Sequence, residues 1–465
     1  MKSSQIGTVV ALACSLFVAS SHAQDQASTP PTNDAILHQM QELQAEVKAL
    51  QAEVTALKGA PATASAPAPA EATTPTAPAA PAAAVATTSA PAASPAPTGL
   101  AGLLGPTTLS GFVDTYYGYN SNQPAGRQNG LRNFDINSGQ FGLNMLELIA
   151  DKAVDNTNRV GYHVSLGFGQ AMNLVNSTET GPGAVPGTST SNFDQYLKEG
   201  YLAYMAPVGK GLQINIGKFV TPNGAEVIET KDNWNYSRSL LFAWAIPYFH
   251  FGASAKYVFN SKFSATGYLV NGWNNSIDNN TGKTGGLSFA WTPNAKFSVI
   301  ENWMGGPEHT NYNGAFRNLF DTVITYNPTA KLSLMANYDY GHDHFVNSAI
   351  PGIPPFVVGP RAVWSGLAGY VKYAPNDKYA FSLRGEYFDD NQGFMTGVIG
   401  GQEASEFTAT FQRTIAKSII TRLEFRRDMS DSAVFARGNF GDPFVKTQNT
   451  VTLGVVYAFS SADSK

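Results

Sequence analysis

The chain has 465 residues, of which 43% are hydrophobic, 12% are aromatic and only 14% are charged, whereas an ordinary soluble domain carries about 25% charged residues. The net charge of -4 argues against a nucleic-acid-binding protein, and the mean hydropathy of -0.15 argues against a bundle of membrane helices. The single cysteine excludes a disulfide framework, and the remaining combination of few charges with many aromatic residues and 44 glycines is typical of β structure.

The first predicted element is a signal peptide over residues 1–23. Lys2 supplies a positive start, residues 6–19 form an apolar core too short to span a membrane, and residues 21–23 (Ser-His-Ala) form a cleavage site. Cys14 lies inside this segment, so the mature chain is predicted to contain no cysteine. A lipoprotein signal cleaved before Cys14 is the alternative, but apolar residues continue past that cysteine. We therefore expect an exported protein.

A short coiled coil is predicted over residues 33–58. Apolar residues alternate at spacings of four and three, which is the heptad pattern of a coiled-coil seam. These residues are Ile36, Met40, Leu43, Val47, Leu50, Val54 and Leu57. The pattern favours a homo-oligomer, although a lone amphipathic helix lying on another surface is an alternative. Three heptads are too few to determine the number of chains.

Residues 59–106 are predicted to be an Ala/Pro-rich linker. Most of this segment consists of alanine, proline, threonine and serine. Frequent prolines exclude a helix and favour an extended, semi-rigid chain. The segment has no means of building a core, so we interpret it as a tether between the coiled coil and the C-terminal part of the chain.

Residues 107–459 change to a pattern in which apolar and polar residues alternate in segments of about ten residues. Between residues 419 and 426, for example, Ile419, Thr421 and Leu423 alternate with Arg422 and Glu424. This alternation fits both a soluble β-sandwich and a membrane barrel, because each has one apolar face per strand. The connections between the segments distinguish the two.

Short and long connections alternate strictly along this part of the chain. The short turns are predicted at residues 151–158, 207–211, 260–262, 293–296, 327–331, 375–378 and 416–417. The long connections are predicted at residues 120–138, 170–194, 222–239, 274–283, 305–315, 341–361, 391–402 and 431–446. Short periplasmic turns and long outer loops are typical of transmembrane barrels. The connections predict an all-β, antiparallel, up-and-down barrel of about 16 strands, with 14 to 18 possible, followed by a tail at residues 460–465.

Aromatic residues cluster where the predicted strands meet the predicted loops, which favours aromatic girdles at the two membrane interfaces over a soluble core. They are Tyr116, Tyr117, Tyr119, Trp244, Tyr248, Phe249, Trp273, Tyr338, Tyr340, Tyr387 and Phe388.

The middle of this region resembles the OmpL-like putative beta-barrel porin family. The residues that carry the resemblance are Ile216-Gly217-Lys218-Phe219, Asn233, Tyr236-Ser237-Arg238-Ser239, Pro247-Tyr248-Phe249-His250-Phe251-Gly252, Asn271-Gly272-Trp273, and Asp278-Asn279-Asn280 leading to Lys283-Thr284. Residues 109–119 are similar to the first strand of that family. The resemblance implies a pore in the bacterial outer membrane and implies no particular substrate.

Charged residues at polar positions of the predicted strands are candidates for the lining of the pore, because rings of charged side chains set selectivity in channels. They are Asp114, Asp339, Arg384, Glu386, Glu406, Arg422, Glu424 and Arg426. The alternative is that such residues only satisfy one another in the barrel wall. The connection at residues 221–240 is a candidate constriction loop that folds inward, with Glu226, Glu229, Lys231, Asp232 and Arg238. Its alternative is an external loop.

No catalytic or metal-binding pattern emerges. His342-Asp343-His344 has the spacing of a metal pair, but it lacks a third ligand nearby and is interpreted as a polar rim. Residues 278–282 resemble half of a calcium loop, but Phe289 occupies the position of the required glutamate. We therefore predict no enzyme activity, no metal and no cofactor, although a barrel hydrolase remains a third hypothesis.

We predict an outer-membrane porin that allows passive diffusion of small hydrophilic solutes through a water-filled barrel. Its expected partners are outer-membrane lipid and further copies of the chain, a trimer by analogy, with no nucleic acid. The alternative is a structural protein whose periplasmic coiled coil ties the outer membrane to the cell wall or to a periplasmic partner.

Overall fold

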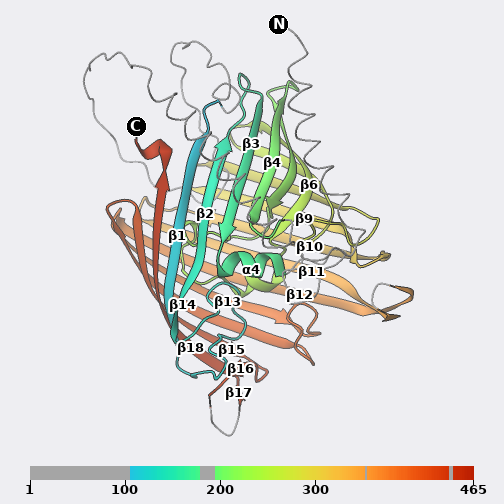
Figure 1. Ribbon diagram of the computed structural model, residues 1–465, viewed down its shortest axis with the longest axis vertical. Helices are drawn as coiled ribbons and strands as arrows, with labels where there is room; N and C mark the ends of the chain where they lie inside the picture. The colour runs from blue at the N-terminus through green and yellow to red at the C-terminus, as the bar shows by residue number, and fades with distance from the viewer. Residues whose placement is uncertain (1–104, 178–193, 351–352, 439–442, 465) are drawn as a thin grey trace, which may run out of the picture. The chain divides into compact units, whose positions relative to one another are not determined.

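The structure is a computed structural model that describes residues 105–177, 194–350, 353–438 and 443–464 (Figure 1). The predicted signal peptide, the coiled-coil segment and the linker up to residue 104 lie outside the described residues. Those three assignments therefore stay predictions.

The β region forms one closed antiparallel sheet, which confirms the predicted barrel of 16 strands. Its strands are β1 (Thr108–Asn120), β2 (Gln140–Lys152), β3 (Val160–Phe168), β4 (Leu197–Ala206), β5 (Leu212–Val220), β6 (Phe249–Asn260), β7 (Phe263–Val270), β8 (Thr284–Asn294), β9 (Phe297–His309), β10 (Tyr312–Tyr326), β11 (Leu332–Ile350), β12 (Ile353–Asn376), β13 (Tyr379–Asp390), β14 (Gln402–Ile415), β15 (Ile419–Ser430) and β18 (Thr447–Ser460). Each strand pairs with its neighbour in sequence, and β1 pairs with β18 from Ser110↔Ser460 to Asn120↔Thr450.

Shorter elements occupy the connections. The helix α4 (Gln170–Ser177) follows β3, and a small hairpin of β16 (Phe435–Ala436) and β17 (Phe444–Val445) lies between β15 and β18. The connection from β5 to β6 carries η1 (Thr230–Asp232), a single 3-10 turn, and η2 (Leu241–Ala245), a π-helical turn. A last 3-10 turn, η3 (Ser461–Ser464), follows β18.

The strands bury one face and expose the other, as the alternation predicts. Along β13 the exposed side chains are Tyr379, Phe381 and Leu383, whereas Ser382 and Arg384 are buried. An apolar outer face suits lipid, and closure leaves no unpaired edge strand in the sheet. The lumen is therefore the polar side of the wall.

Two of the predicted loops are paired strands. Residues 305–315 continue the β9–β10 hairpin as far as His309↔Tyr312, and residues 341–361 continue the β11–β12 hairpin past Asp343↔Ala362. The strands β11 and β12 have 19 and 24 residues, although about 10 suffice to cross a membrane (Figure 1). Both segments are rich in glycine and proline, which is why the sequence suggested loops.

Only some of the aromatic residues assigned to the predicted girdles point outward. Tyr117, Tyr119, Tyr338 and Tyr387 are exposed on the outer face, but Tyr116, Tyr248, Phe249, Trp273 and Phe388 are buried. The division between Tyr116 and Tyr117 follows from the alternation, because adjacent side chains on a strand point to opposite faces. A further set of exposed aromatic residues lies beside the short turns: Tyr204, Phe259, Trp291, Tyr326, Tyr373 and Tyr457.

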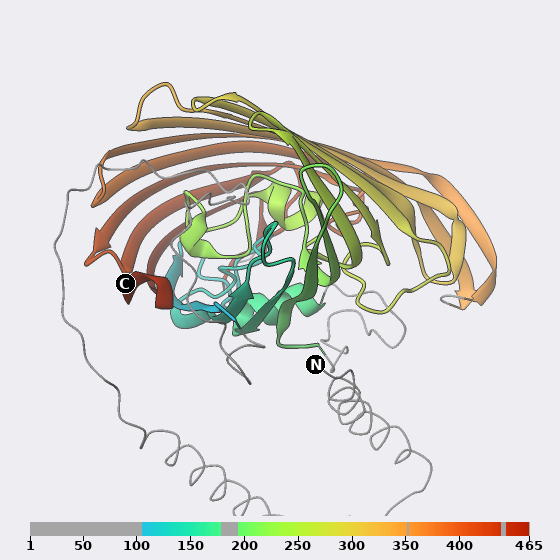
Figure 2. The same ribbon diagram turned by 90° about the horizontal axis from the view of Figure 1, so that it is seen from above.

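Most of these buried aromatic residues belong to a hydrophobic core that connects the wall with the long connections. In this core Phe112, Trp364 and Phe388 come from strands, whereas Phe134 and Phe242 come from connections. Figure 2 shows the segment between β5 and β6 inside the ring of strands. The barrel therefore contains packed protein as well as polar wall residues.

Candidate functional site: the loop inside the barrel

The candidate site is built around residues 221–248, which connect β5 to β6 and which we call the inner loop (Figure 2). Its apolar second half explains why it turns inward. Leu240, Leu241, Phe242 and Ile246 are almost fully buried in the hydrophobic core, and the indole Nε1 of Trp364 on β12 donates to the carbonyl of Ala245 at 3.0 Å. Burying four such side chains stabilises the docked loop by several kcal/mol at about 1.5–3 kcal/mol each.

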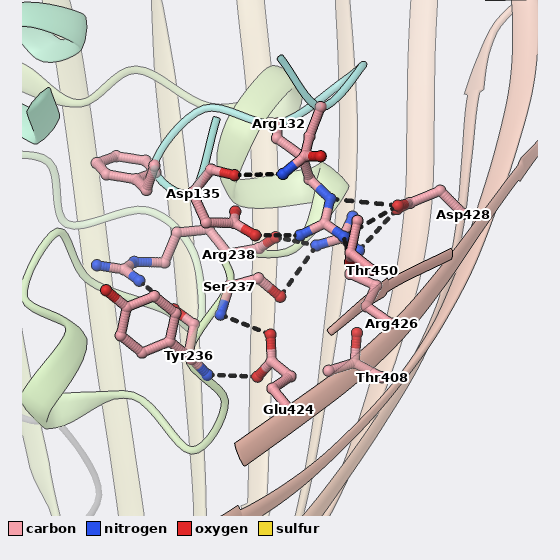
Figure 3. A network of polar contacts seen from close by, with 12 residues as sticks. Arg132, Asp135, Tyr236, Ser237, Arg238, Thr408, Glu424, Arg426, Asp428 and Thr450 are labelled. Atoms are coloured by element: carbon pink, nitrogen blue, oxygen red, sulfur yellow. Dashed lines mark hydrogen bonds and ion pairs between the residues drawn. The ribbon is translucent and has the colours of Figure 1, made fainter. Parts of the chain in front are cut away.

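Strand β15 holds the loop backbone with alternating charges. The guanidinium of Arg422 donates to the carbonyls of Thr230, Asn233 (2.6 Å) and Asn235 (3.1 Å). Glu424 accepts from the backbone N–H groups of Tyr236 at 2.6 Å and Ser237 at 2.9 Å (Figure 3). Because hydrogen bonds to charged groups are worth about 1.5–3 kcal/mol each, these residues determine the path of the loop.

A second set of charges joins β13, β14 and β15 to the loop. Arg384 contacts Glu406 at 2.6 Å and the loop's Glu226 at 2.7 Å, and it donates to the carbonyl of Ser237 at 2.7 Å. Arg426 contacts Asp428 at 2.7 Å and Glu406 at 3.4 Å and donates to the carbonyl of Arg238. Glu386 accepts from the N–H of Leu240 at 2.5 Å and of Leu241 at 3.2 Å. These charged groups are buried, so each needs its ion-pair and hydrogen-bond partners to offset the cost of removing it from water.

Strand β1 holds the loop from another part of the wall. Asp114 accepts from the hydroxyl of Thr230 at 2.6 Å, from Tyr236 at 2.9 Å and from Asn144 of β2 at 2.6 Å. Burial and the neighbouring Asp114 carboxylate raise the pKa of Tyr236 well above its usual range, so the phenol stays protonated and donates. Lys198 of β4 contacts Glu229 of the loop and, at 2.6 Å, Glu147 of β2.

Strands β9 to β11 contact the first residues of the loop. The side-chain amide of Asn302 donates to the carbonyl of Pro222 at 3.0 Å, and the side-chain oxygen of Asn337 accepts from the N–H of Ala225 at 3.2 Å. Both amides also donate to Asp321, at 2.6 and 2.7 Å. The inner loop is thus bonded to β9 and β11 through its first residues and to β1 and β15 through its middle residues.

Residues 121–139, the connection after β1, reinforce this arrangement. Arg132 contacts Asp135 at 2.5 Å and Asp428 of β15 at 3.1 Å (Figure 3). The amide of Asn133 donates to the carbonyl of Ala243 at 2.8 Å, which joins this connection to the inner loop.

All eight predicted wall residues are almost fully buried, and most of them contact the inner loop. The residues that do so directly are Asp114, Arg384, Glu386, Arg422, Glu424 and Arg426. Glu406 acts through Arg384 and Arg426, and Asp339 lies beside Asn337 at 3.5 Å. The structure thus places these residues as supports of the loop, and their role as pore lining stays a prediction.

The five predicted loop residues fall into two groups. Glu226, Glu229 and Arg238 are bonded into the protein, and Arg238 donates to the carbonyls of Val227 and Ile228. Lys231 and Asp232 pair with each other at 2.6 Å, with 26% and 46% of their side chains exposed. Asn133, Lys198, Asn302 and Trp364 were missed, because nothing in their local sequence indicates contact with a loop about 30 to 120 residues away.

The His-Asp-His segment lies on β11 rather than at the start of a loop. Asp343 is buried and contacts His309 at 2.9 Å and Arg317 at 2.8 Å, whereas the half-buried His342 and His344 occupy the opposite parity of the strand. In the described part of the chain, no three histidine, cysteine or acidic side chains gather as a metal site would require.

The described helices are too short or too polar to span a membrane.

The model of one protein family matches residues 106–459, and that family is described as putative beta-barrel porin-2, OmpL-like. The chain belongs to this family. The match covers the barrel from β1 to the penultimate residue of β18 and confirms the resemblance seen in the sequence. Membership indicates a porin-like protein of the bacterial outer membrane.

Solved structures similar to this chain include three from different bacteria. OmpF of Salmonella typhi, solved in complex with daunomycin, has a TM-score of 0.49 and 11% identity, with 76% of this chain and 97% of that chain covered. The anion-selective porin of Comamonas acidovorans has a TM-score of 0.47 and 14% identity, with coverages of 76% and 99%. OmpT of Vibrio cholerae has a TM-score of 0.45 and 12% identity, with coverages of 76% and 97%. A search of the curated proteins found no match.

Proposed function

We propose that this porin allows small hydrophilic solutes to diffuse passively across the outer membrane and that the inner loop is its constriction. One observation carries the proposal: wall residues on both sides of the ring, from Asp114 on β1 to Asn337 on β11, bond to the same loop. A segment held in this way crosses the lumen and narrows whatever water path passes it.

Within this proposal, the wall and the loop have different tasks. The buried wall residues that contact the inner loop shape the passage by holding this loop in place. Lys231 and Asp232 are the most exposed charges among the loop candidates, so they are the groups that a passing ion meets. Exposed charges at a narrow point act on permeating ions through their field.

The experiment is the conductance and ion selectivity of the purified full-length protein in a planar bilayer. Discrete channel steps are expected, and Lys231→Glu should shift the selectivity towards cations. Lys210→Glu, in an exposed short turn, is the matched control and should leave selectivity unchanged. Absence of channel steps would refute the diffusion pore, and equal shifts from the two variants would refute the role of the inner loop.

The predicted extension suggests a second function. The heptad seam and the Ala/Pro-rich linker favour a homo-oligomer, trimeric by analogy, with a periplasmic extension that contacts the cell wall. Deletion of residues 34–98 tests this candidate, which requires a smaller oligomer or the loss of wall association. If both remain unchanged in the deletion variant, the tethering function is wrong.

A further inference from the structure

A cavity of 310 Å³ lies between the inner loop and the connections at the same end of the barrel. It is lined by residues including Trp244, Tyr248, Trp273, Asn274, Glu308 and Arg317. Ligand sites in proteins have volumes of roughly 300–1,000 Å³, so this cavity suits one ring rather than a chain of rings.

Hydrogen bonds hold two aromatic side chains of the cavity in place, and their rings line it. Tyr248 donates its hydroxyl to the carbonyl of Ala243 at 3.0 Å and accepts from Asn133 at 2.6 Å. Trp244 donates its indole N–H to the carbonyl of Leu131 at 3.3 Å. Since these polar atoms are engaged, the two residues offer a ligand mainly apolar surface, which suits the C–H faces of a ring.

The polar lining groups still have bonding capacity. The side-chain oxygen of Asn274 accepts from the N–H groups of Tyr248 at 2.7 Å and Phe249 at 3.2 Å, which orients its amide nitrogen as a donor. Arg317 engages Asp343 through Nε at 2.8 Å, and its terminal nitrogens remain donors. Glu308 accepts from the N–H of Trp273 at 2.9 Å and from Thr284 at 2.5 Å, and its carboxylate has further lone pairs.

The charges around the cavity disfavour an anionic ligand. Among the described residues that line it, Arg317 carries the positive charge, and its guanidinium lies 4.8 Å from the ring of Trp273. Its charge is already compensated by Asp343, and the buried Glu308 adds a second carboxylate to the same region. Donors and acceptors that alternate beside aromatic surface, with no surplus positive charge, match hydroxyl groups on an apolar ring.

We propose that this cavity, one side of which is formed by the inner loop, binds one uncharged, hydroxylated ring of monosaccharide size. The proposal rests on the proposed porin function, because it names the solute class that such a pore would take up. The aromatic lining packs against the faces of the ring, and Asn274, Glu308 and Arg317 bond to its hydroxyl groups.

The test measures binding to the full-length protein in detergent by tryptophan fluorescence, with three sugars that share one ring. These are glucose, anionic glucuronate and cationic glucosamine. Glucose should give a saturable change in the millimolar range, anionic glucuronate should bind at least tenfold more weakly, and glucosamine should bind no more tightly than glucose. Asn274→Asp keeps the acceptor for Tyr248 and Phe249 but removes the free donor, so it should weaken glucose binding about tenfold. Trp291→Phe, on the exposed outer face, is the control and should bind glucose normally.

The possible outcomes separate this inference from the proposed function. No saturable change with glucose, or tighter binding of glucuronate or glucosamine, overturns the inference. An equal effect of Trp291→Phe and Asn274→Asp also overturns it. Conductance of the same preparation is measured in parallel. A conducting protein that does not bind glucose refutes only the cavity, whereas a binding protein that shows no channel steps refutes only the pore.

Discussion

Arg426 and Arg427 offer a direct test of how the inner loop is held, because they are adjacent residues of the same type on opposite faces of β15. Arg426→Met removes a buried guanidinium that contacts Asp428 at 2.7 Å, Glu406 at 3.4 Å and the carbonyl of Arg238. Arg427→Met removes an exposed side chain whose guanidinium contacts Asn449 at 3.2 Å.

The structure sets the expected magnitude. Removing one partner of a buried ion pair costs about 3–5 kcal/mol, because the other charge stays buried. Asp428 keeps Arg132 at 3.1 Å and Glu406 keeps Arg384 at 2.6 Å, so we expect the lower end, about 3 kcal/mol. Arg427→Met should change the free energy of unfolding by no more than about 0.5 kcal/mol.

The assay is urea unfolding of the purified barrel in detergent, followed by tryptophan fluorescence, together with single-channel conductance. With a slope of about 3 kcal/mol per molar urea, Arg426→Met should lower the midpoint by about 1 M. Release of the carbonyl of Arg238 should also raise the conductance. Equal midpoints for the two variants would contradict the reasoning that buried charges anchor the inner loop.

Three further predictions concern other contacts. Arg422→Lys should raise the conductance and lower stability by about 2–4 kcal/mol, because one ammonium cannot reach three loop carbonyls; an unchanged current and urea midpoint would contradict this. Gly454→Ala should cost about 1–3 kcal/mol in urea unfolding, because a Cβ there would lie 2.2 Å from the ring of Tyr236, whereas Gly385→Ala, whose nearest atom is 3.9 Å away, should be tolerated. In the turn after β2, hydrogen bonds from the N–H groups of Asn158 and Thr157 lower the pKa of Asp155, so the urea midpoint of the wild type should exceed that of Asp155→Ala at neutral pH. This difference should disappear as pH falls through and below the usual aspartate pKa of about 3.9, and a difference that persists there would contradict the assignment.

The barrel could be predicted from the sequence because its rule is local. Lipid on one side requires an apolar side chain at every second position, and this period is visible in Val451, Leu453 and Val455 without knowledge of any partner. The same rule fails outside the membrane. The ends of β11 and β12 contain Gly341, Pro354, Pro355, Gly359 and Pro360 and therefore looked like a loop, although their backbones pair.

The inner loop could be predicted only in part. Charges on inward strand positions indicated a polar lumen, and the acidic and basic residues of 221–240 suggested a segment that enters it. The contacts themselves depend on distant partners: Asp114 and Thr230 are separated by 116 positions, and Arg422 and Asn233 by 189. No local pattern marks such pairs. Aromatic residue type was equally uninformative, since Tyr116 and Tyr117 face opposite sides of the wall.

The pairing of β1 with β18 has a consequence for the order of assembly. The inner loop lies near the middle of the chain, but its anchors Arg384, Glu386, Arg422, Glu424 and Arg426 all belong to strands that are synthesised later, and Asp114 belongs to the first strand. The loop therefore has few of its partners until the C-terminal strands are in place beside β1. Closure of the ring and docking of the loop are then coupled events. In an incompletely closed barrel the inner loop would stay undocked and would not narrow the lumen.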